Sequence, residues 1–180
     1  MIADVILLAL LVAGFFVGFF RGTIRALFAV GGWAVCFVLA AYARQAIGDW
    51  LARSASFDAL YANMLGFALI FFAFFLAVLV LVVFSRSPTA LARHPLFDDV
   101  LGGVIGVVVA VLVIATVQVM LDTYYTVDNP ATLSDFGTLA EFRRAMEGSA
   151  IVGVISNTVI PWLAFLFGPI LPSDVRAVMG

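Results

Sequence analysis

The chain has 180 residues, of which 65% are hydrophobic and 11% are charged, and its formal net charge at pH 7 is −2. Soluble domains are about 25% charged, and a water-soluble fold of this size could not bury so much apolar surface. The composition therefore excludes a soluble enzyme, a disordered tail and a disulfide-bonded secreted module, and the charge excludes a basic surface for nucleic acid.

Four apolar stretches are long enough to cross a bilayer. A spanning helix needs roughly 20 apolar residues, because the hydrocarbon core is about 30 Å thick and a helix rises about 1.5 Å per residue. The stretches cover residues 2–20, 26–43, 60–84 and 100–121. The first has no basic region before it and no polar stretch after it, so we do not expect a cleavable signal peptide. We predict an all-α fold in which residues 1–121 form a four-helix transmembrane bundle in contact with lipid.

The arginines near the span ends predict the orientation. The turns after the first and third spans lie on the same side of the membrane and hold Arg21, Arg25, Arg86 and Arg93. The loop expected after the second span, on the opposite side, holds Arg44 and Arg53. Because arginine is enriched in cytoplasmic loops, we predict that the turns with four arginines are cytoplasmic. The amino terminus and the segment after the fourth span are then extracytoplasmic.

The segment 122–180 is expected to be an extracytoplasmic loop followed by amphipathic helices at the membrane. Thr138 and Glu141 have the spacing of a capping box, which predicts a short helix ending near Gly148. Residues 150–171 are apolar enough for a fifth span. However, Pro161 interrupts them, and small or polar residues share one helical face, namely Ser149, Gly153, Ser156 and Asn157. This pattern favours an interfacial or bundle-docked helix pair over a clean span.

The residue inventory argues against catalysis. The chain has no lysine, a single histidine (His94) and a single cysteine (Cys36), and it contains no catalytic or phosphate-binding motif. Its two candidate intramembrane aspartates, Asp4 and Asp122, lie at span ends. We therefore expect no enzyme, no cofactor and no metal site.

Transport by a single copy is also disfavoured, because a solute path needs polar groups at membrane depth. Only the fourth span carries such residues, Thr116 and Gln118. A single glutamine in a span more often makes an interhelical hydrogen bond than a substrate contact. A pore formed between several copies remains an alternative.

Small residues recur at every fourth position in two of the spans. In the first they are Gly14, Gly18 and Gly22, and in the fourth Gly102, Gly106 and Ala110. Such stripes allow two helix backbones to approach closely. They predict either helix packing within one bundle or a contact between copies.

Two aspartates have both a structural and a functional interpretation. Asp4 lies on the glycine face of the first span, where it can complement the helix dipole or make a polar contact into the bundle or a partner. Asp98 has the position of an N-cap for the fourth span and could also pair with Arg21 or Arg25.

The order of these features resembles the colicin V production (CvpA) family. The segments that carry the resemblance are Asp4, residues 18–25 with Gly18-Phe-Phe-Arg21-Gly22 and Arg25, Gly32-Trp33, Phe97-Asp98-Asp99 with Gly102 and Gly106, Gly148-Ser149 and Pro161-Trp162. The tail segment is also similar to the end of the membrane domain that precedes some periplasmic serine proteases. Together these segments cover most of the chain, from about residue 2 to 165.

The resemblance implies a four-span bacterial inner-membrane protein associated with toxin production and envelope homeostasis. Two departures concern ion pairs: Ala26 stands where some members have glutamate, and Val109 or Ala110 stands where some have arginine. These departures disfavour an ion-conducting role. We expect a scaffold or accessory factor that binds a second copy or another membrane or periplasmic protein. The alternatives are a subunit of an oligomeric channel or transporter, and an anchor that once preceded an extracytoplasmic enzyme.

Overall fold

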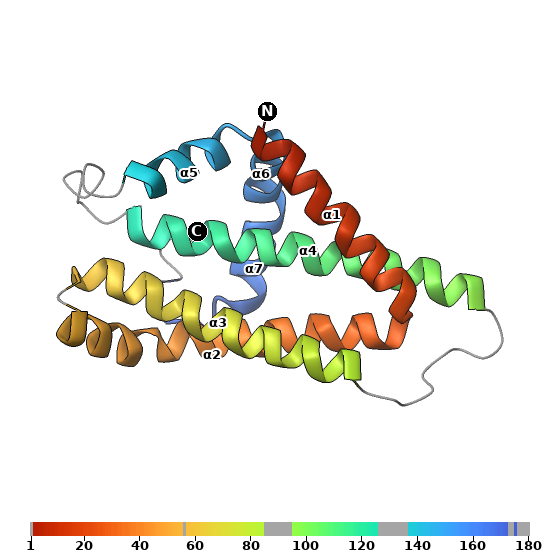
Figure 1. Cartoon of the computed structure of the whole chain (residues 1–180), viewed down its shortest axis with the longest axis horizontal. Coiled ribbons are helices and arrows are strands. Elements are labelled where there is room, and N and C mark those ends of the chain that lie inside the picture. Colours follow the sequence, from red (N-terminus) through yellow and green to blue (C-terminus); the bar gives the residue numbers. More distant parts are fainter. Residues whose placement is uncertain (1, 56, 85–94, 126–136, 173–174, 176–180) are drawn as a thin grey trace.

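The computed structural model describes residues 2–55, 57–84, 95–125, 137–172 and 175, most of which are helical (Figure 1). No strand occurs in this described part of the chain, which confirms the all-α prediction. The predictions made for Arg86, Arg93 and His94 lie outside the described residues.

The described residues contain eight helical segments. They are α1 (Ile2–Arg21), α2 (Thr23–Ala55), α3 (Ala59–Phe84), α4 (Pro95–Tyr125), α5 (Gly137–Glu147), α6 (Ala150–Val154), the π-helical turn η2 (Ile155–Val159) and α7 (Ile160–Phe167). The helix α5 confirms the short helix that was expected before Gly148.

The second helix is longer than its apolar stretch, and the expected middle loop is wrong in part. We placed Arg44 and Arg53 in that loop, but both lie within α2. A fall in hydropathy along the sequence marks the end of an apolar segment. A helix ends only where its backbone hydrogen bonds are interrupted. Gly48 does not break it, because this residue packs against Asn63 of α3: a Cβ at Gly48 would lie 2.1 Å from Asn63 Oδ1.

The turn between α1 and α2 is also shorter than the expected five residues. A single residue, Gly22, separates the two helices. Its φ of 77° lies in the left-handed region, which glycine adopts without a steric penalty. One glycine is therefore enough to reverse the chain.

Within the residues that the structure describes, five helical segments are long and apolar enough to cross a membrane, one more than the four spans that we expected. The additional one covers Ala150–Phe167. Pro161 does not split this segment into a helix pair, because the chain passes through η2 immediately before it and continues as α7. A π turn accommodates the amide that proline lacks by shifting the hydrogen-bond register.

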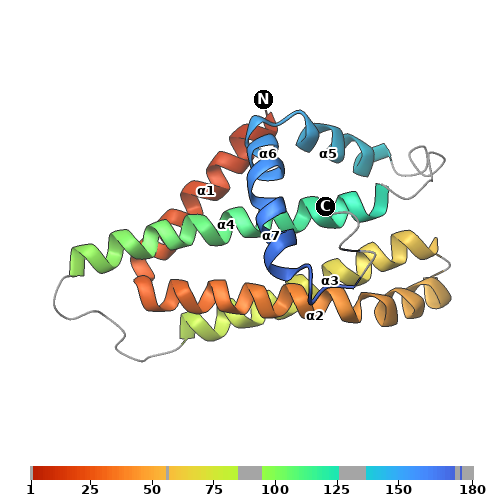
Figure 2. The same ribbon diagram turned by 180° about the vertical axis from the view of Figure 1, so that it is seen from behind.

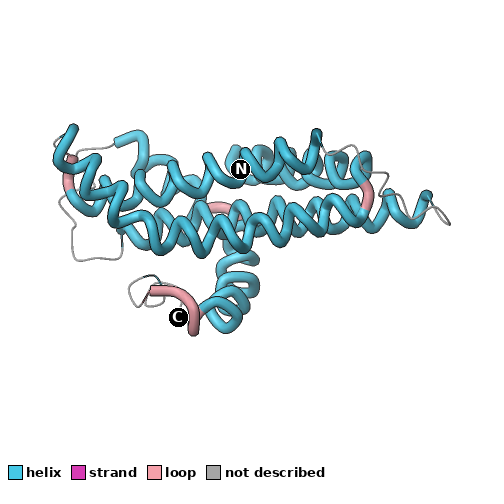
Figure 3. The backbone as a smooth tube through the Cα atoms, turned by 90° about the horizontal axis from the view of Figure 1, so that it is seen from below, coloured by secondary structure: helices cyan, strands magenta, loops and turns pink. Residues whose placement is uncertain are grey.

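The long helices α2 and α3 lie side by side and antiparallel, α4 runs alongside them, and α1 crosses α4 obliquely (Figure 1). Viewed from behind, α6 and α7 run across α4 toward α2 (Figure 2). Seen from below, the end of the tail projects beyond the layer of the four long helices (Figure 3).

Aromatic side chains form the centre of the apolar core. Trp33 and Phe37 of α2 stack on each other, with ring centroids 5.3 Å apart, and Phe167 of α7 meets both rings edge-on. Val152 and Ile155, near the start of the tail helix, are each only 3% exposed. The tail therefore contributes to the same core as the long helices.

Candidate functional site

The two stripes of small residues face each other where α1 crosses α4. A Cβ added to Gly18 would lie 2.1 Å from the carbonyl oxygen of Gly102, and one added to Gly106 would lie 2.1 Å from that of Gly14. The backbones are thus in direct contact, and no larger residue fits without moving a helix. We call this contact, made by Gly14, Gly18, Gly102 and Gly106, the glycine seam.

At one end of the glycine seam, Asp98 of α4 binds the start of α2. Its carboxylate accepts a hydrogen bond from the Thr23 amide at 3.0 Å, and its backbone oxygen accepts one from the Thr23 hydroxyl at 2.9 Å. Our interpretation of Asp98 as the N-cap of its own helix is wrong, because α4 begins earlier, at Pro95. Asp98 instead satisfies an amide at the start of α2, in the place that an N-cap side chain usually fills.

Gly22 belongs to this junction as well. A Cβ at Gly22 would lie 2.6 Å from Asp98 Oδ2. The glycine therefore serves two purposes, since it provides the left-handed turn and leaves room for the carboxylate that caps α2.

Asp4 fastens the other end of α1 to the tail. The Ser149 hydroxyl donates to Asp4 Oδ1 at 2.7 Å, and the Ala150 amide donates to the same oxygen at 3.0 Å. Ser149 is the N-cap of α6 and also accepts a hydrogen bond from the Val152 amide. Of the two interpretations of Asp4, the structure shows the polar contact into the bundle; the carboxylate also lies in the first turn of α1.

A third polar contact lies within the core. The Trp33 indole donates to the Thr116 hydroxyl at 3.0 Å, and that hydroxyl donates to the Leu112 carbonyl at 2.8 Å. Both side chains are 2% exposed. The indole N–H is thus satisfied by α4, as a buried tryptophan requires.

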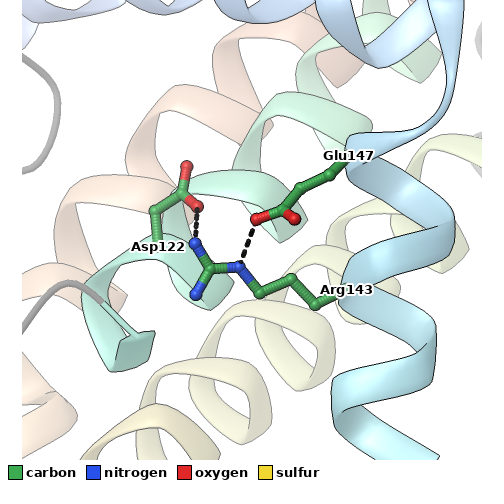
Figure 4. Close-up of polar contacts among 3 residues, drawn as sticks. All are labelled: Asp122, Arg143 and Glu147. Atoms are coloured by element: carbon green, nitrogen blue, oxygen red, sulfur yellow. Dashed lines mark hydrogen bonds and ion pairs between the residues drawn. The ribbon is translucent and has the colours of Figure 1, made fainter. Parts of the chain in front are cut away.

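One ionic contact joins the helix α5 to the end of α4, and a second pair lies within α5 (Figure 4). Arg143 Nη2 lies 3.8 Å from Asp122 Oδ1, and Arg143 Nε donates to Glu147 Oε1 at 2.7 Å. The spacing of Arg143 and Glu147, four residues apart on one helix, already indicates that pair. The longer contact to Asp122 has no signal in the sequence, because it joins two helices.

The remaining predicted site residues are Arg21, Arg25 and Pro161. Arg21 and Arg25 are half-buried and line a groove between the four long helices. Pro161 is exposed beside Trp162 and Phe165. In the part of the chain that the structure describes, no three His, Cys, Asp or Glu side chains gather as metal ligands would.

A model of the colicin V production protein family matches residues 3–160. The chain belongs to this family. The matched region contains Asp4, the glycine seam, Asp98 and Ser149, and it ends one residue before Pro161. Searches of curated proteins and of solved structures found no match.

Family membership together with the apolar helices identifies a multi-pass membrane protein. Sequence reasoning missed the contact of Asp4 with Ser149 and that of Asp98 with Thr23. The partners are 145 and 75 positions apart, so their sequence spacing gives no signal. The presence of Thr116 in an apolar span could have indicated a partner for a buried indole, since hydroxyl groups at membrane depth commonly bond across helices.

Proposed function

We propose that this protein acts by association in the bacterial inner membrane, as a scaffold or accessory factor in the production or export of a colicin V-like toxin and in envelope homeostasis. Membership of the colicin V production protein family supports a membrane role in toxin production. The proposal includes no catalytic step, and it has the amino terminus and the tail on the extracytoplasmic side.

One observation carries the association role: the polar groups of the junctions described above bond to the chain's own helices. Trp33 bonds to Thr116, Asp98 to the start of α2, and Asp4 to the start of α6. Groups engaged in this way hold a bundle in one arrangement and do not line a solute path. The arrangement therefore supports a rigid body that other proteins bind.

Large apolar side chains cover the outer faces of the bundle. Those with more than 60% exposure include Val5, Ile6 and Phe20 of α1, Leu76, Leu81 and Phe84 of α3, and Trp162, Phe165 and Leu166 of α7. The glycine stripes are already used within the chain, so they do not remain for an intermolecular contact. We therefore expect any partner to bind the outer faces of α1, α3 or α7.

Site-specific photocrosslinking in living cells tests this role. A photoreactive residue replaces Phe20, Leu76 or Trp162, each on a different outer face, and Gln45, an exposed polar position of α2, provides the control. We expect one of the three faces to give a discrete adduct with a second copy or with a component of toxin export, and the control to give none. We also expect deletion of the gene for this protein to abolish toxin secretion.

The opposite result would be the absence of a protein adduct at all three faces, together with unchanged toxin secretion in the deletion strain. That result would exclude the association role.

The alternative function is a subunit of an oligomeric channel or transporter. The observation that favours it is Arg44, which is 6% exposed within a helix long enough to span and which lies beside Asn63 of α3. Ionisable side chains inside membrane segments often mark ion or substrate paths. Purified protein that conducts ions in liposomes, and loses this activity on Arg44→Gln, would replace the scaffold proposal with this one.

A further inference from the structure

The tail contains the fifth segment that is long enough to cross a membrane. This segment, formed by α6, η2 and α7, covers Ala150–Phe167 and contains no charged residue; we call it the tail helix. Its 18 residues, at about 1.5 Å each, extend roughly 27 Å, close to the thickness of the hydrocarbon core. A helix that crosses the membrane has its ends on opposite sides. The contacts of the two ends therefore decide whether the tail helix is a span.

The amino end of the tail helix is bound to the start of α1. The Ser149 hydroxyl and the Ala150 amide both donate to the carboxylate of Asp4, in the first turn of α1. Consecutive spans cross a membrane in opposite directions, and Gly22 alone separates α1 from α2. The start of α1 therefore lies on the same side of the membrane as the carboxyl end of the apolar stretch of α2.

The carboxyl end of the tail helix is bound to α2 near that same side. The ring of Phe167 meets that of Phe37 edge-on, with centroids 6.0 Å apart. Directly after the helix, the Ile170 carbonyl oxygen accepts a hydrogen bond from the Tyr42 hydroxyl. Tyr42 lies at the end of the apolar stretch of α2, residues 26–43. The two ends of the tail helix thus bind the same end of the bundle.

The chain remains at this end beyond the tail helix. Val175 is 1% exposed and lines a small space together with Arg44 of α2 and Asn63 of α3. Arg44 directly follows the apolar stretch of α2, and Asn63 lies near the start of α3. These two residues mark the same side of the membrane, because α2 and α3 are consecutive spans.

The direction and depth of the tail helix agree with these contacts. In both ribbon views, α6 and α7 run crosswise to α2 and α4, two of the long apolar helices (Figure 1, Figure 2). A helix crosswise to the spans lies along the plane of the membrane. Phe167 also meets Trp33, in the interior of the apolar stretch of α2. At this level Val35 and Leu39 of α2 are 68% and 40% exposed, as side chains that face lipid are.

The outward face of the tail helix is apolar over its second half. Trp162, Phe165 and Leu166 are 69%, 78% and 63% exposed. The polar side chain of Asn157, which is also exposed, donates to the Gly153 carbonyl oxygen of its own helix. A side-chain amide that is bonded in this way is less costly to place in hydrocarbon.

We propose that the tail helix lies flat within one leaflet of the bilayer, the leaflet on the side of the amino terminus, and that its outward face binds the acyl chains of that leaflet. The occupant follows from the depth. A face at the level of the lipid-facing residues of α2 is surrounded by the same hydrocarbon. The protein then crosses the membrane four times, although five segments are long enough to do so.

This inference goes beyond the proposed association role and does not depend on it. It assigns the outer face of α7 to lipid, which leaves the outer faces of α1 and α3 for a protein partner. A protein adduct at Trp162 in the crosslinking experiment would overturn this inference without affecting the association role.

Cysteine labelling tests on which side each end of the tail helix lies. The single cysteine, Cys36, is replaced by alanine, and one new cysteine is placed at Phe57, Leu96 or Ala145, or is appended after Gly180. Phe57 lies between α2 and α3, Leu96 lies at the start of α4, and Ala145 precedes the tail helix; all three are exposed. A membrane-impermeant maleimide is added to spheroplasts, and detergent-opened spheroplasts give the total labelling. The cysteines at 145 and after 180 should label as the one at 57 does, and the one at 96 should be protected.

Spin labels test the depth in liposomes that contain the purified protein. Labels at Thr158 and Phe165, two exposed positions on one face of the tail helix, should lie at nearly the same depth. Both should collide more often with oxygen, which dissolves in hydrocarbon, than with a water-soluble nickel chelate. A label at Ala145, exposed on the polar helix α5, is the control and should show the reverse preference. A spanning helix would instead place Thr158 near the bilayer centre, about 10 Å deeper than Phe165.

Four results would overturn the proposal. Labelling of the appended cysteine like that at 96 would show that the tail helix is a fifth span, and so would a label at Thr158 that lies about 10 Å deeper than one at Phe165. Frequent collisions of both labels with the nickel chelate, as at Ala145, would place the face in water. Rare collisions with both oxygen and the chelate would show that protein covers the face.

Discussion

Replacing Gly18 by alanine is the sharpest test of the contact between α1 and α4. The added Cβ would lie 2.1 Å from the Gly102 carbonyl oxygen and 2.9 Å from both the Gly102 carbonyl carbon and the Gly106 Cα. All three atoms belong to the backbone of α4, so no side chain can rotate away. Ordinary contact between a Cβ and another heavy atom begins at 3.4 Å, which is about 1.3 Å more than the distance from the added Cβ to the Gly102 carbonyl oxygen. The two helices must therefore separate.

Separation by this distance removes the close backbone contact along the seam. Overpacking of a closely packed interior costs about 1–3 kcal/mol, and in a bilayer no hydrophobic drive between helices offsets the loss. We therefore expect Gly18→Ala to lower the free energy of unfolding by about 1–3 kcal/mol. Unfolding by SDS in mixed micelles, followed by loss of helical circular dichroism, measures the change.

The matched control is Gly31→Ala in the interior of α2. A Cβ at Gly31 meets no atom within 4 Å, and the residue is exposed. Alanine has the higher helix propensity, so this variant should be as stable as the original protein or slightly more stable. Equal unfolding midpoints for Gly18→Ala and Gly31→Ala would refute the close approach of α1 and α4.

Three further substitutions test the polar junctions, each measured by the same unfolding assay. Thr116→Val removes the acceptor of the Trp33 indole and should cost roughly 0.6–1.7 kcal/mol; a double-mutant cycle with Trp33→Phe should show coupling, and strict additivity would contradict the hydrogen bond. Gly22→Ala forces alanine into the left-handed region beside Asp98, so a loss of about 1–3 kcal/mol is expected, and an unchanged midpoint would show that the turn can rearrange. Ser149→Ala removes the N-cap of α6 and its bond to α1, which should cost about 0.5–2 kcal/mol and expose the tail to protease; unchanged protection of the tail would argue against this anchor.

The sequence was sufficient for those parts of the fold that depend on local pattern. Hydropathy placed the carboxyl ends of α1 and α3 to within a residue, because there the apolar run and the helix end together. It failed at α2, whose helix continues to Ala55 through a polar segment in which Gly48 does not break the helix. Hydropathy indicates which part of a helix is surrounded by lipid. The length of the helix depends instead on how far its backbone hydrogen bonds continue.

The candidate site was less predictable, for a different reason. The stripes of small residues showed which helix faces pack closely, but they left open whether the partner is the same chain or another copy. Asp4 and Asp98 were recognised as unusual, yet the groups that they bind could not be assigned. A carboxylate near a span end can accept from several exposed amides, and only the path of the chain in space decides which amide it meets.

The distribution of polar contacts also limits how a partner can be recognised. In lipid, the backbone groups of each helix are satisfied within that helix, and apolar side chains pack without strong directional preference. Directional selectivity must therefore come from side-chain hydrogen bonds or from shape. The junctions formed by Asp4, Trp33 and Asp98 are directed inward, whereas the outer faces of α1 and α3 are lined by valine, leucine and phenylalanine. A partner that binds these faces has to be selected by the fit of its surface, so we expect changes of side-chain volume there to alter association more than changes of charge at the helix ends.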